Sequence, residues 1–415
     1  MDESSLISYI EKNSREKLNF NCSMIIKSIG DDTAIFRDKN NILITSDTLT
    51  ENTHFRTDYY SFSQIGAKAL LVNISDIASM GGTPRFFILS LLVPDYLTEV
   101  HIQETIDGII ETAKKDKISL IGGNISKARE FSISITLLGD YSVKQRAAMR
   151  YSAEYDDLIF VSGNIGDAWL SYYIMENSEQ IKEHAEDSYK IYKAGNSNKG
   201  NKSKTSGEYK APKDTKSKNT LIQFIENYAK KNLIHPSRVR LGKILAANKI
   251  ANSMTDISDG LYKDINNLLS GKDKNSGALI IADDIPLSDE FKNITKILNL
   301  KNTDILNNII SFGEDYELLW STKRANEDKL LEIAKKEKIK ISKIGSVVKY
   351  NTDENQNQGI DDIRYNNGTS SCSDTDLAAN ERTNERRTNE RTRVNFIYKN
   401  KALVITPMTF KHVSS

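Results

Sequence analysis

Short apolar runs of strand length alternate with longer stretches of helical spacing along most of this 415-residue chain. Apolar runs bounded by Gly, Asp or Pro are typical of buried strands, whereas apolar residues at every third or fourth position are typical of amphipathic helices. Because the two patterns interleave, we expect a mixed α/β fold. The expected strands are residues 42–49, 86–93, 118–121, 131–139, 157–162, 278–285, 316–321 and 341–348. The expected helices are residues 63–80, 99–115, 167–174, 221–231, 237–251, 261–269 and 326–336.

Two strongly polar stretches interrupt this alternation. Residues 193–220 hold eight Lys but only two acidic residues, and residues 350–393 end in the short repeat NERTNERRTNERT. Such stretches bury too little apolar surface to offset the entropy lost on ordering, so we expect two disordered inserts, with an RNA-binding or partner-binding tail as the alternative. The rest, about 340 residues, is long enough for two domains. We place these domains at residues 1–150 and at residues 151–349 together with 394–415.

Charge and cysteine content exclude several classes of protein. The 57 basic and 56 acidic residues give a net charge of +1, so no global basic field would attract nucleic acid or an acidic membrane. The two cysteines, Cys22 and Cys372, cannot form a disulfide framework or a cysteine-based metal site, which fits a reducing compartment. The longest apolar run, residues 86–94, is about half the length needed to cross a bilayer. We therefore expect a soluble cytoplasmic protein without nucleic-acid or membrane partners.

Short acidic motifs stand at the ends of the apolar runs, often beside Gly. They carry carboxylates and hydroxyls without accompanying His or Cys, and such hard oxygen ligands suit Mg²⁺ or Mn²⁺ better than zinc or copper. Each motif alone is explained equally well by a helix N-cap or a turn. Several together would repel one another unless cations held them, and a cluster of this size is expected where several Mg²⁺ ions carry a polyphosphate. The motifs are Gly30-Asp31-Asp32, Thr45-Ser46-Asp47, Asn73-Ile74-Ser75-Asp76, Asp256-Ile257-Ser258-Asp259-Gly260 and Gly313-Glu314-Asp315-Tyr316-Glu317.

Known phosphate-binding loops are missing from the sequence. There is neither a Gly-x-x-x-x-Gly-Lys-Ser/Thr loop nor the glycine loop of protein kinases, which makes those two folds unlikely candidates. Gly122-Gly123-Asn124 offers a bare backbone that a phosphate can approach closely, and Arg150 is a candidate phosphate partner or a surface ion pair. His54, taken alone, fits a structural role as well as a ligand role.

In order and spacing, these motifs resemble the thiamine-monophosphate kinase family, of the superfamily that includes aminoimidazole ribonucleotide synthetase and selenophosphate synthetase. The similarity covers nearly all of the chain outside the two polar stretches. It also includes His54-Phe55, Lys68-Ala69-Leu70, Met80-Gly81-Gly82 and the residues that extend the motifs above, such as Leu261 and Leu318-Leu319.

The resemblance implies a two-domain PurM-like fold. The first domain would carry a small β-sheet that pairs with a second subunit to close a β-barrel, and the second would be an α/β domain, so a homodimer is expected. It also implies the reaction, in which Mg-ATP phosphorylates thiamine phosphate to give thiamine diphosphate and ADP. No catalytic residue separate from the metal ligands is then needed, because the attacking phosphate oxygen is already anionic near neutral pH.

Residue roles carry over by position. Several Mg²⁺ ions would be bound by Asp32, Thr45, Ser46, Asp47, Asp76, Asn124, Asp256 and Asp259. ATP would contact Gly123, Asn124, Arg150 and Ser258, and thiamine phosphate would contact His54, Glu314 and the aromatic ring of Phe410.

The sequence departs from the family pattern at two positions. Asn124 stands where the family usually has Asp, so affinity for the ion there should fall, although an amide oxygen still suits Mg²⁺. Phe312 stands where a second Gly often precedes Gly313, which narrows the expected thiamine pocket. Two alternatives stay open: a sister ATP-dependent enzyme acting on a purine precursor or selenide, and a non-catalytic nucleotide-binding relative.

Overall fold

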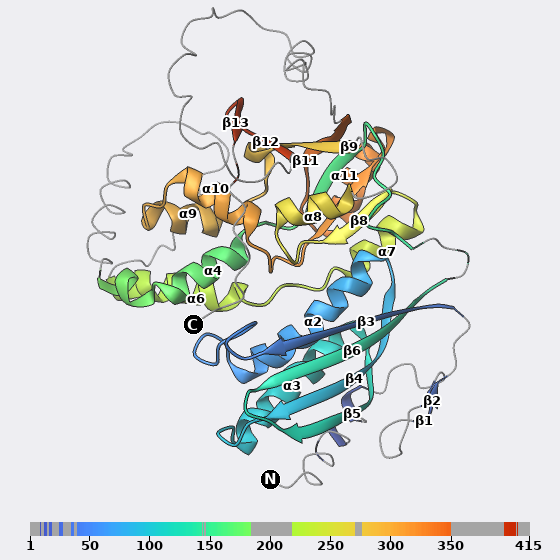
Figure 1. The fold of residues 1–415 in the computed structure, drawn as a ribbon, viewed down its shortest axis with the longest axis vertical. Coiled ribbons are helices and arrows are strands. Elements are labelled where there is room, and N and C mark those ends of the chain that lie inside the picture. The colour runs from blue at the N-terminus through green and yellow to red at the C-terminus, as the bar shows by residue number, and fades with distance from the viewer. Residues whose placement is uncertain are drawn as a thin grey trace, which may run out of the picture.

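The chain consists of two α/β halves, each built around its own sheet (Figure 1). The computed structural model describes residues 40–142, 147–183, 218–269, 276–349 and 394–403, together with Lys144, Ile405 and short pieces before residue 37. Strands β3 to β6 form the first sheet, and strands β7 to β13 form the second. The expected domain boundary at residue 150 falls between these two sets of strands. Strands β1 (Ile25–Lys27) and β2 (Ile35–Phe36) pair separately.

The first sheet has the strand order β3-β6-β4-β5. Its β3–β6 and β6–β4 pairs are antiparallel, whereas β4 and β5 are parallel and are joined through helix α3. Helices α2 and α3 pack against one face of this sheet (Figure 1). The elements are β3 (Asn41–Thr50), α2 (Phe62–Ser79), β4 (Thr83–Val93), α3 (Glu99–Asp116), β5 (Ser119–Lys127) and β6 (Ser132–Tyr141).

Helices α2 and α3 are held together by a close backbone approach. Helix α2 begins after Ser61, whose hydroxyl accepts from the Gln64 amide in a capping box. A Cβ atom on Gly66 would lie 2.0 Å from the Thr105 carbonyl oxygen, and one on Gly108 would lie 1.9 Å from the Ser63 carbonyl oxygen. The two glycines therefore let the helices approach more closely than any side chain would permit.

The opposite face of the first sheet exposes apolar side chains. Strand β3 alternates between more and less buried residues, as expected for a strand whose two faces differ. Ile44 is 68% exposed, and Ile42, Ile88 and Leu92 are each 39% exposed. An exposed group of large aliphatic side chains on one sheet face is typical of a protein–protein contact surface.

The second sheet has the order β13-β12-β9-β11-β7-β10-β8 and is antiparallel except between β12 and β9. Because β12 pairs with β9, the segment after the second polar stretch returns to the sheet of the second half. The strands are β7 (Leu158–Ser162), β8 (Ser253–Asp256), β9 (Ser276–Ile281), β10 (Leu318–Thr322), β11 (Ile341–Lys349), β12 (Val394–Tyr398) and β13 (Lys401–Leu403).

Both faces of the second sheet are covered at its centre. Along β7, Leu158 and Phe160 belong to the core shared with the first half, whereas Ile159 and Val161 belong to a second core. This explains the continuous apolar run in that strand. The helices are α4 (Asp167–Glu176), α6 (Lys218–Asn232), α7 (Val239–Ala247), α8 (Leu261–Leu268), α9 (Asp289–Ile297), α10 (Asn302–Ser311) and α11 (Glu327–Glu337).

One of the two hydrophobic cores is shared by the two halves. Helix α2 lies between them and contacts both α7 and β8 (Figure 1). Leu70 and Ile74 of α2 belong to the same buried cluster as Leu241, Met254 and Trp320 of the second half.

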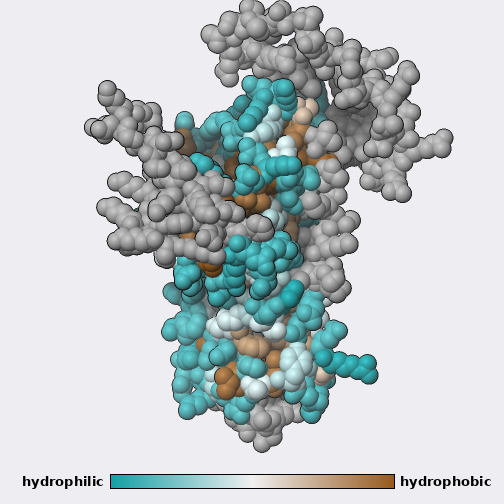
Figure 2. All heavy atoms as spheres, turned by 90° about the vertical axis from the view of Figure 1, so that its left-hand side faces the viewer, coloured by the Kyte–Doolittle hydropathy of each residue, from teal (hydrophilic) through white to brown (hydrophobic). Residues whose placement is uncertain are grey.

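The surface seen from the side in Figure 2 is mostly hydrophilic, with hydrophobic atoms gathered in patches on both halves. In the described part of the chain, no helix combines the length and the apolar character needed to cross a membrane.

The mixed α/β prediction is confirmed, and each expected strand and helix has a counterpart. The sequence interpretation missed strands β1, β2, β8, β12 and β13 and helices α9 and α10. The expected strand at 278–285 ends early, because residues Ala282–Asp284 form a 3-10 helix. Helix α6 begins at Lys218, so the expected insert at 193–220 extends three residues too far, and its described part is helical. The other expected insert, residues 350–393, lies outside the described residues.

Candidate active site

Three of the expected aspartates meet where α2 packs against β8. Thr45 donates a hydrogen bond from Oγ1 to Asp76 Oδ2 at 2.5 Å, which joins β3 to α2. Ser75, next to Asp76 on α2, donates from Oγ to Asp256 Oδ2 at 2.6 Å, which joins α2 to β8. The junction between the two halves is therefore made through carboxylates.

The pKa values of all three aspartates are raised, so their negative charge is not fully compensated by neighbouring protein groups. Burial and the neighbouring Asp76 raise the pKa of Asp47 to about 6, and the same two causes raise the pKa of Asp256 to about 6. Burial also raises the pKa of Asp76. Asp256 Oδ1 is buried and has no hydrogen-bond partner among the described residues. A buried carboxylate oxygen without a partner is what a cation-binding position presents before a cation arrives.

The all-oxygen character of this junction fits Mg²⁺, but the described residues do not form a complete metal centre. No three His, Cys, Asp or Glu side chains in the described part of the chain come together in an arrangement that could hold a metal ion. Two other acidic residues were expected to bind metal: Asp32 lies outside the described residues, and Asp259 is in the loop before α8. The donors present therefore fit hard-cation chemistry and supply part of the coordination that it needs.

Arg150 lies in the connector between the halves, near the aspartates. Its charge lowers the pKa values of Asp76 and Asp256, although burial raises both overall. Ser253 of β8 fixes this connector, because its hydroxyl donates to the Arg150 carbonyl oxygen at 2.6 Å. The Arg150 side chain is exposed, so a bound anion can reach it.

Two of the acidic motifs pair with each other through their backbones. The Glu314 amide donates to the Ser258 carbonyl oxygen at 3.0 Å, and the Tyr316 amide donates to the Ile257 carbonyl oxygen at 2.8 Å. A Cβ atom on Gly313 would lie 1.9 Å from the Ser258 oxygen, so only glycine permits this approach. Glu314 adopts a φ of 69°, in the left-handed region, which turns its side chain toward the first half.

Asp264 is a residue of the candidate site that the sequence interpretation missed. Its Oδ2 accepts hydrogen bonds from the amides of Ser258 and Asp259, both at 3.1 Å, and so fixes the loop before α8. Burial, followed by Asp256 and Asp259, raises its pKa to about 7. An acidic residue in the first turn of a helix that follows Ser258-Asp259-Gly260 was a signal that could have identified it. Asp259 itself forms an ion pair with Lys263 at 2.8 Å.

Glu314 and His54, both expected to contact thiamine phosphate, are linked through Lys68 of α2. Lys68 Nζ lies 2.5 Å from Glu314 Oε2 and donates to the His54 carbonyl oxygen at 2.8 Å. His54 Nδ1 accepts from the Thr50 amide at 3.1 Å, which fixes its ring against the end of β3. The structure thus brings these two expected residues together and adds Lys68, whose motif was noted in the sequence without a role.

The rest of the 313–317 motif is structural. Asp315 is buried and accepts from the Gly166 amide at 3.0 Å, and Tyr316 stacks on His235 with ring centroids 4.2 Å apart. Glu317 accepts from Arg238 Nε at 2.6 Å and from Ser162 Oγ at 2.5 Å. These three side chains hold the loop in place. The Glu314 side chain points to Lys68 of the first half.

Three expected site residues lie away from the aspartates within one chain. Ser46 points to the exposed face of the sheet, where its hydroxyl lies 2.9 Å from that of Thr136, because neighbouring residues of a strand face opposite sides. Gly123 and Asn124 are on β5, at the opposite edge from β3, about 14 Å away if each strand step is near 4.8 Å. Phe410 lies outside the described residues.

Gly123 has a structural role in its strand. A Cβ atom there would lie 2.0 Å from the Leu89 carbonyl oxygen of β4, whereas one on Gly122 would meet nothing closer than 3.7 Å. The bare backbone at Gly123 is therefore required by the neighbouring strand, whatever else approaches it. The expected strand at 118–121 continues through both glycines to Lys127.

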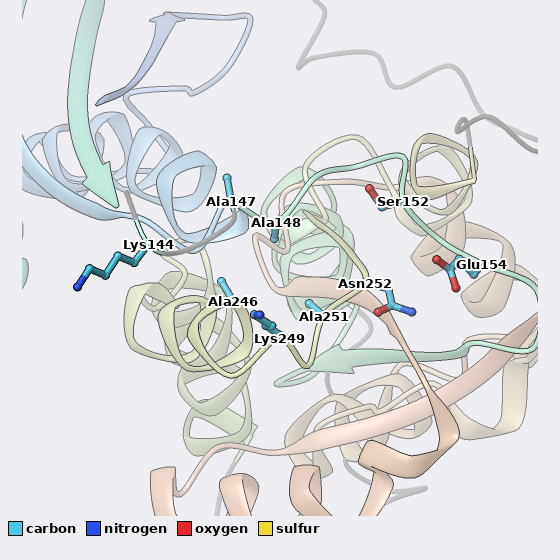
Figure 3. Close-up of a pocket in the computed structure, with 9 residues that line it drawn as sticks. All are labelled: Lys144, Ala147, Ala148, Ser152, Glu154, Ala246, Lys249, Ala251 and Asn252. Atoms are coloured by element: carbon cyan, nitrogen blue, oxygen red, sulfur yellow. The ribbon is translucent and has the colours of Figure 1, made fainter. Parts of the chain in front are cut away.

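A cavity of about 450 Å³ opens beside the connector, but none of the expected site residues line it. In Figure 3, Lys144 and Glu154 lie at opposite ends of this cavity, and Ala246 and Ala251 lie between them. The aspartates, Ser258 and Glu314 have the charge and the converging motifs that a phosphate-transfer site needs, so we place the candidate active site at their junction.

The fold and this all-oxygen site define a protein of the AIR synthase-related class, with the PurM-like arrangement of two mixed α/β halves. Residues 30–140 match the family described as AIR synthase related protein, N-terminal domain. That match contains the whole first sheet except the end of β6 at Tyr141.

Relatives that match most of the chain narrow this class. A thiamine-monophosphate kinase of Buchnera aphidicola is 31% identical over 343 residues, which cover 82% of this chain and 88% of that relative. The crystal structure of thiamine-monophosphate kinase from Stenotrophomonas maltophilia K279a has a TM-score of 0.63 at 27% identity, covering 84% of this chain and 95% of that one. A structure described as AaThiL complexed with AMPPCP and TMP has a TM-score of 0.55 at 26% identity, covering 84% and 91%. The chain belongs to the thiamine-monophosphate kinase family and is an enzyme of that family.

Proposed function

We propose that this enzyme transfers the γ-phosphoryl group of ATP to the phosphate of thiamine phosphate, giving thiamine diphosphate and ADP. The observation that carries the proposal is the junction itself. The half-buried carboxylates of Asp47 and Asp76 and the buried carboxylate of Asp256 lie beside the loop that pairs Ser258 with Glu314. A relative whose structure is described as complexed with AMPPCP and TMP, an ATP analogue and the proposed substrate, supports the same pair of ligands.

The aspartates would hold Mg²⁺ through their carboxylate oxygens. Asp256 Oδ1 is buried without a hydrogen-bond partner among the described residues, which supports this role, and Asp76 lies beside it. Bound Mg²⁺ would offset the negative charge of ATP and of the acceptor phosphate. We assign Asp32, Thr45, Asp47, Asp76, Asp256 and Asp259 to this role.

The remaining residues bind and orient the two substrates. Arg150 is exposed beside the aspartates and suits a phosphate of ATP, since its guanidinium can donate two parallel hydrogen bonds. Ser258 is held by Asp264 in the loop before α8, where it would contact ATP. Glu314, His54 and Phe410 would contact thiamine phosphate. Because the acceptor phosphate is already anionic, transfer is direct and in line, and no phosphoenzyme should be trapped by labelled ATP.

We propose a homodimer in which the exposed sheet faces of two subunits pack together. The exposed Ile44, Ile88 and Leu92 support this arrangement. Gly123 and Asn124, which lie on the far edge strand of one chain, would then act across the dimer interface, and Ser46 would lie within it. We place the enzyme in the cytoplasm, where its co-substrate ATP is available.

Product formation tests the reaction. Purified protein with ATP, Mg²⁺ and thiamine phosphate should yield thiamine diphosphate, and EDTA should stop it. Asp76→Asn should lower the rate by about 100-fold or more, since charge stabilisation at a phosphoryl-transfer site is worth several kcal/mol. Asp95→Asn is the matched control, because the Asp95 side chain is 88% exposed and pairs with the equally exposed Lys127. Absence of product from wild-type protein that binds ATP would refute the proposed reaction.

Subunit mixing tests the shared site. Asp76→Asn and Asn124→Lys should each be inactive alone if both residues serve the reaction. In a reassorted equal mixture, half of the dimers are mixed and each holds one intact shared site, so about a quarter of wild-type activity should return. No recovery would place all residues of a site in one subunit.

A further inference from the structure

One lysine in the interior connects four elements of the two halves. The Lys68 side chain on α2 is fully buried, with an exposed fraction of 0%. Its ammonium lies 2.5 Å from Glu314 Oε2, and it donates to the His54 carbonyl at 2.8 Å, the Tyr172 hydroxyl at 3.0 Å and the Tyr60 hydroxyl at 3.2 Å. These partners belong to the 313–317 loop, to the segment after β3 and to helix α4.

Every donor of this ammonium has a partner. An ammonium has three N–H donors, and here four oxygen atoms surround it. The two phenols lie 2.5 Å from each other, so one donates to the other while both keep lone pairs that accept from Lys68. The rings also face the cation, with centroids 5.1 Å away for Tyr60 and 5.7 Å for Tyr172.

The charge on Lys68 is kept despite its burial. Burial lowers the pKa of a lysine, but the Glu314 carboxylate and the surrounding phenols raise the pKa of Lys68 above its ordinary value. A buried ion pair of this kind gives little net stability, because desolvation consumes most of the attraction between the charges. Stability alone therefore gives a weak reason for a charged residue at this position.

The pair does fix the geometry of Glu314. Its side chain is 9% exposed, and Oε2 is directed at Lys68, whereas Oε1 makes no hydrogen bond to the described residues. The backbone of Glu314 is in the left-handed region, where a non-glycine residue needs support from its surroundings. Lys68 supplies that support and also holds the backbone of His54.

We propose that Lys68 is the positioning residue of the thiamine pocket: one buried ammonium sets both the Glu314 carboxylate and the His54 segment, and so determines affinity for thiamine phosphate. This inference rests on the proposed function of the site. Lys68 has no exposed surface, so it acts through these two residues and does not touch the substrate. Neither Ser258 nor Arg150, two of the residues assigned to ATP, is among the ion-pair and hydrogen-bond partners of Lys68, so ATP affinity should be independent of Lys68.

A double-mutant cycle separates positioning from simple structural support. We would measure KM for thiamine phosphate, KM for ATP and kcat for wild type, Lys68→Met, Glu314→Gln and the double variant. Each single variant should raise KM for thiamine phosphate about tenfold or more and leave KM for ATP within about twofold. If Lys68 acts through Glu314, the double variant should be within about threefold of Lys68→Met, whereas independent roles would multiply the two effects.

Lys323→Met is the matched control. Lys323 is 48% exposed and pairs with Glu154 at 2.5 Å and with the buried Asp157 at 3.2 Å, so its loss removes lysine–carboxylate pairs that lie outside the site. It should lower the Tm without changing either KM. If Lys68→Met does not fold, Tyr172→Phe removes one acceptor from the ammonium and should raise KM for thiamine phosphate by a smaller factor, again without changing KM for ATP.

The outcomes separate two failures. If wild-type protein forms no thiamine diphosphate, the proposed function is wrong. If wild type is active but the Lys68 and Glu314 effects multiply, or if both KM values rise together, the positioning role of Lys68 is refuted while the reaction stands. Unchanged KM for thiamine phosphate in both Lys68→Met and Tyr172→Phe would refute it as well.

Discussion

His235 should make the protein lose stability in mild acid. Both of its ring nitrogens are buried, neither has a hydrogen-bond partner among the described residues, and one face of the ring stacks on Tyr316. Burial, followed by the nearby charges of Lys68 and Arg238, lowers its pKa to about 3. Protonation therefore takes place almost entirely in the unfolded chain, where histidine has its ordinary pKa near 6.5.

The sign and size follow from proton linkage. Because the unfolded state binds the proton between pH 6.5 and 3, the free energy of unfolding falls as pH falls through that window. With pKa values of about 6.5 unfolded and about 3 folded, the loss is about 0.2 kcal/mol at pH 7 and about 2 kcal/mol at pH 5. Two kcal/mol is a large part of the usual stability of a folded protein.

Comparison with His235→Phe isolates this contribution. Phenylalanine keeps an aromatic ring against Tyr316, whose centroid is 4.2 Å away, but it has no titrating nitrogen. Urea unfolding at pH 7 and pH 5 would give the free energy of unfolding for both proteins. The aspartates with raised pKa values titrate in both proteins, so their contribution cancels in the comparison. Between pH 7 and pH 5 the free energy of unfolding of wild type should therefore fall by about 2 kcal/mol more than that of the variant. A difference that changes by less than about 0.5 kcal/mol between the two pH values would refute the reasoning.

Three further predictions concern packing, charge and assembly. Arg238→Met should cost about 3–5 kcal/mol in urea unfolding, because Glu317 would be buried without its cation, and a loss below about 1 kcal/mol would contradict this. Gly123→Ala should lower the Tm, because the added Cβ would lie 2.0 Å from a backbone oxygen of β4. Gly122→Ala is the control and should leave the Tm unchanged, because the nearest atom to its Cβ would be 3.7 Å away. Equal Tm values for the two variants would contradict the structure. Ile44→Lys, on the exposed sheet face, should halve the mass measured by sedimentation, and an unchanged dimer would place the interface elsewhere.

Local patterns in the sequence predicted the elements well where burial was one-sided or complete. The run at 157–162 and the helical spacing at 63–80 both correspond to real elements, β7 and α2. Strand β8, only Ser253–Asp256, was missed because four residues with two hydroxyls and one carboxylate carry no apolar period. Strand β12 was missed because its pairing with β9 depends on a segment more than 100 residues away in sequence.

The sequence by itself determined which chemical groups the protein has for its reaction. The oxygen ligands and their flanking glycines can be read directly from the sequence, because ligand type and backbone freedom are local properties of each residue. The family resemblance followed from the order of those motifs.

Only the tertiary structure decided which of these groups meet. It placed Asp76 beside both Asp47 and Asp256 but turned Ser46 to the other face of the sheet. It also revealed Asp264 and Lys68, whose roles arise from partners in distant segments. Side-chain direction alternates along a strand, but which face is buried depends on long-range packing of helices and sheets, and that packing is decided by the whole chain at once.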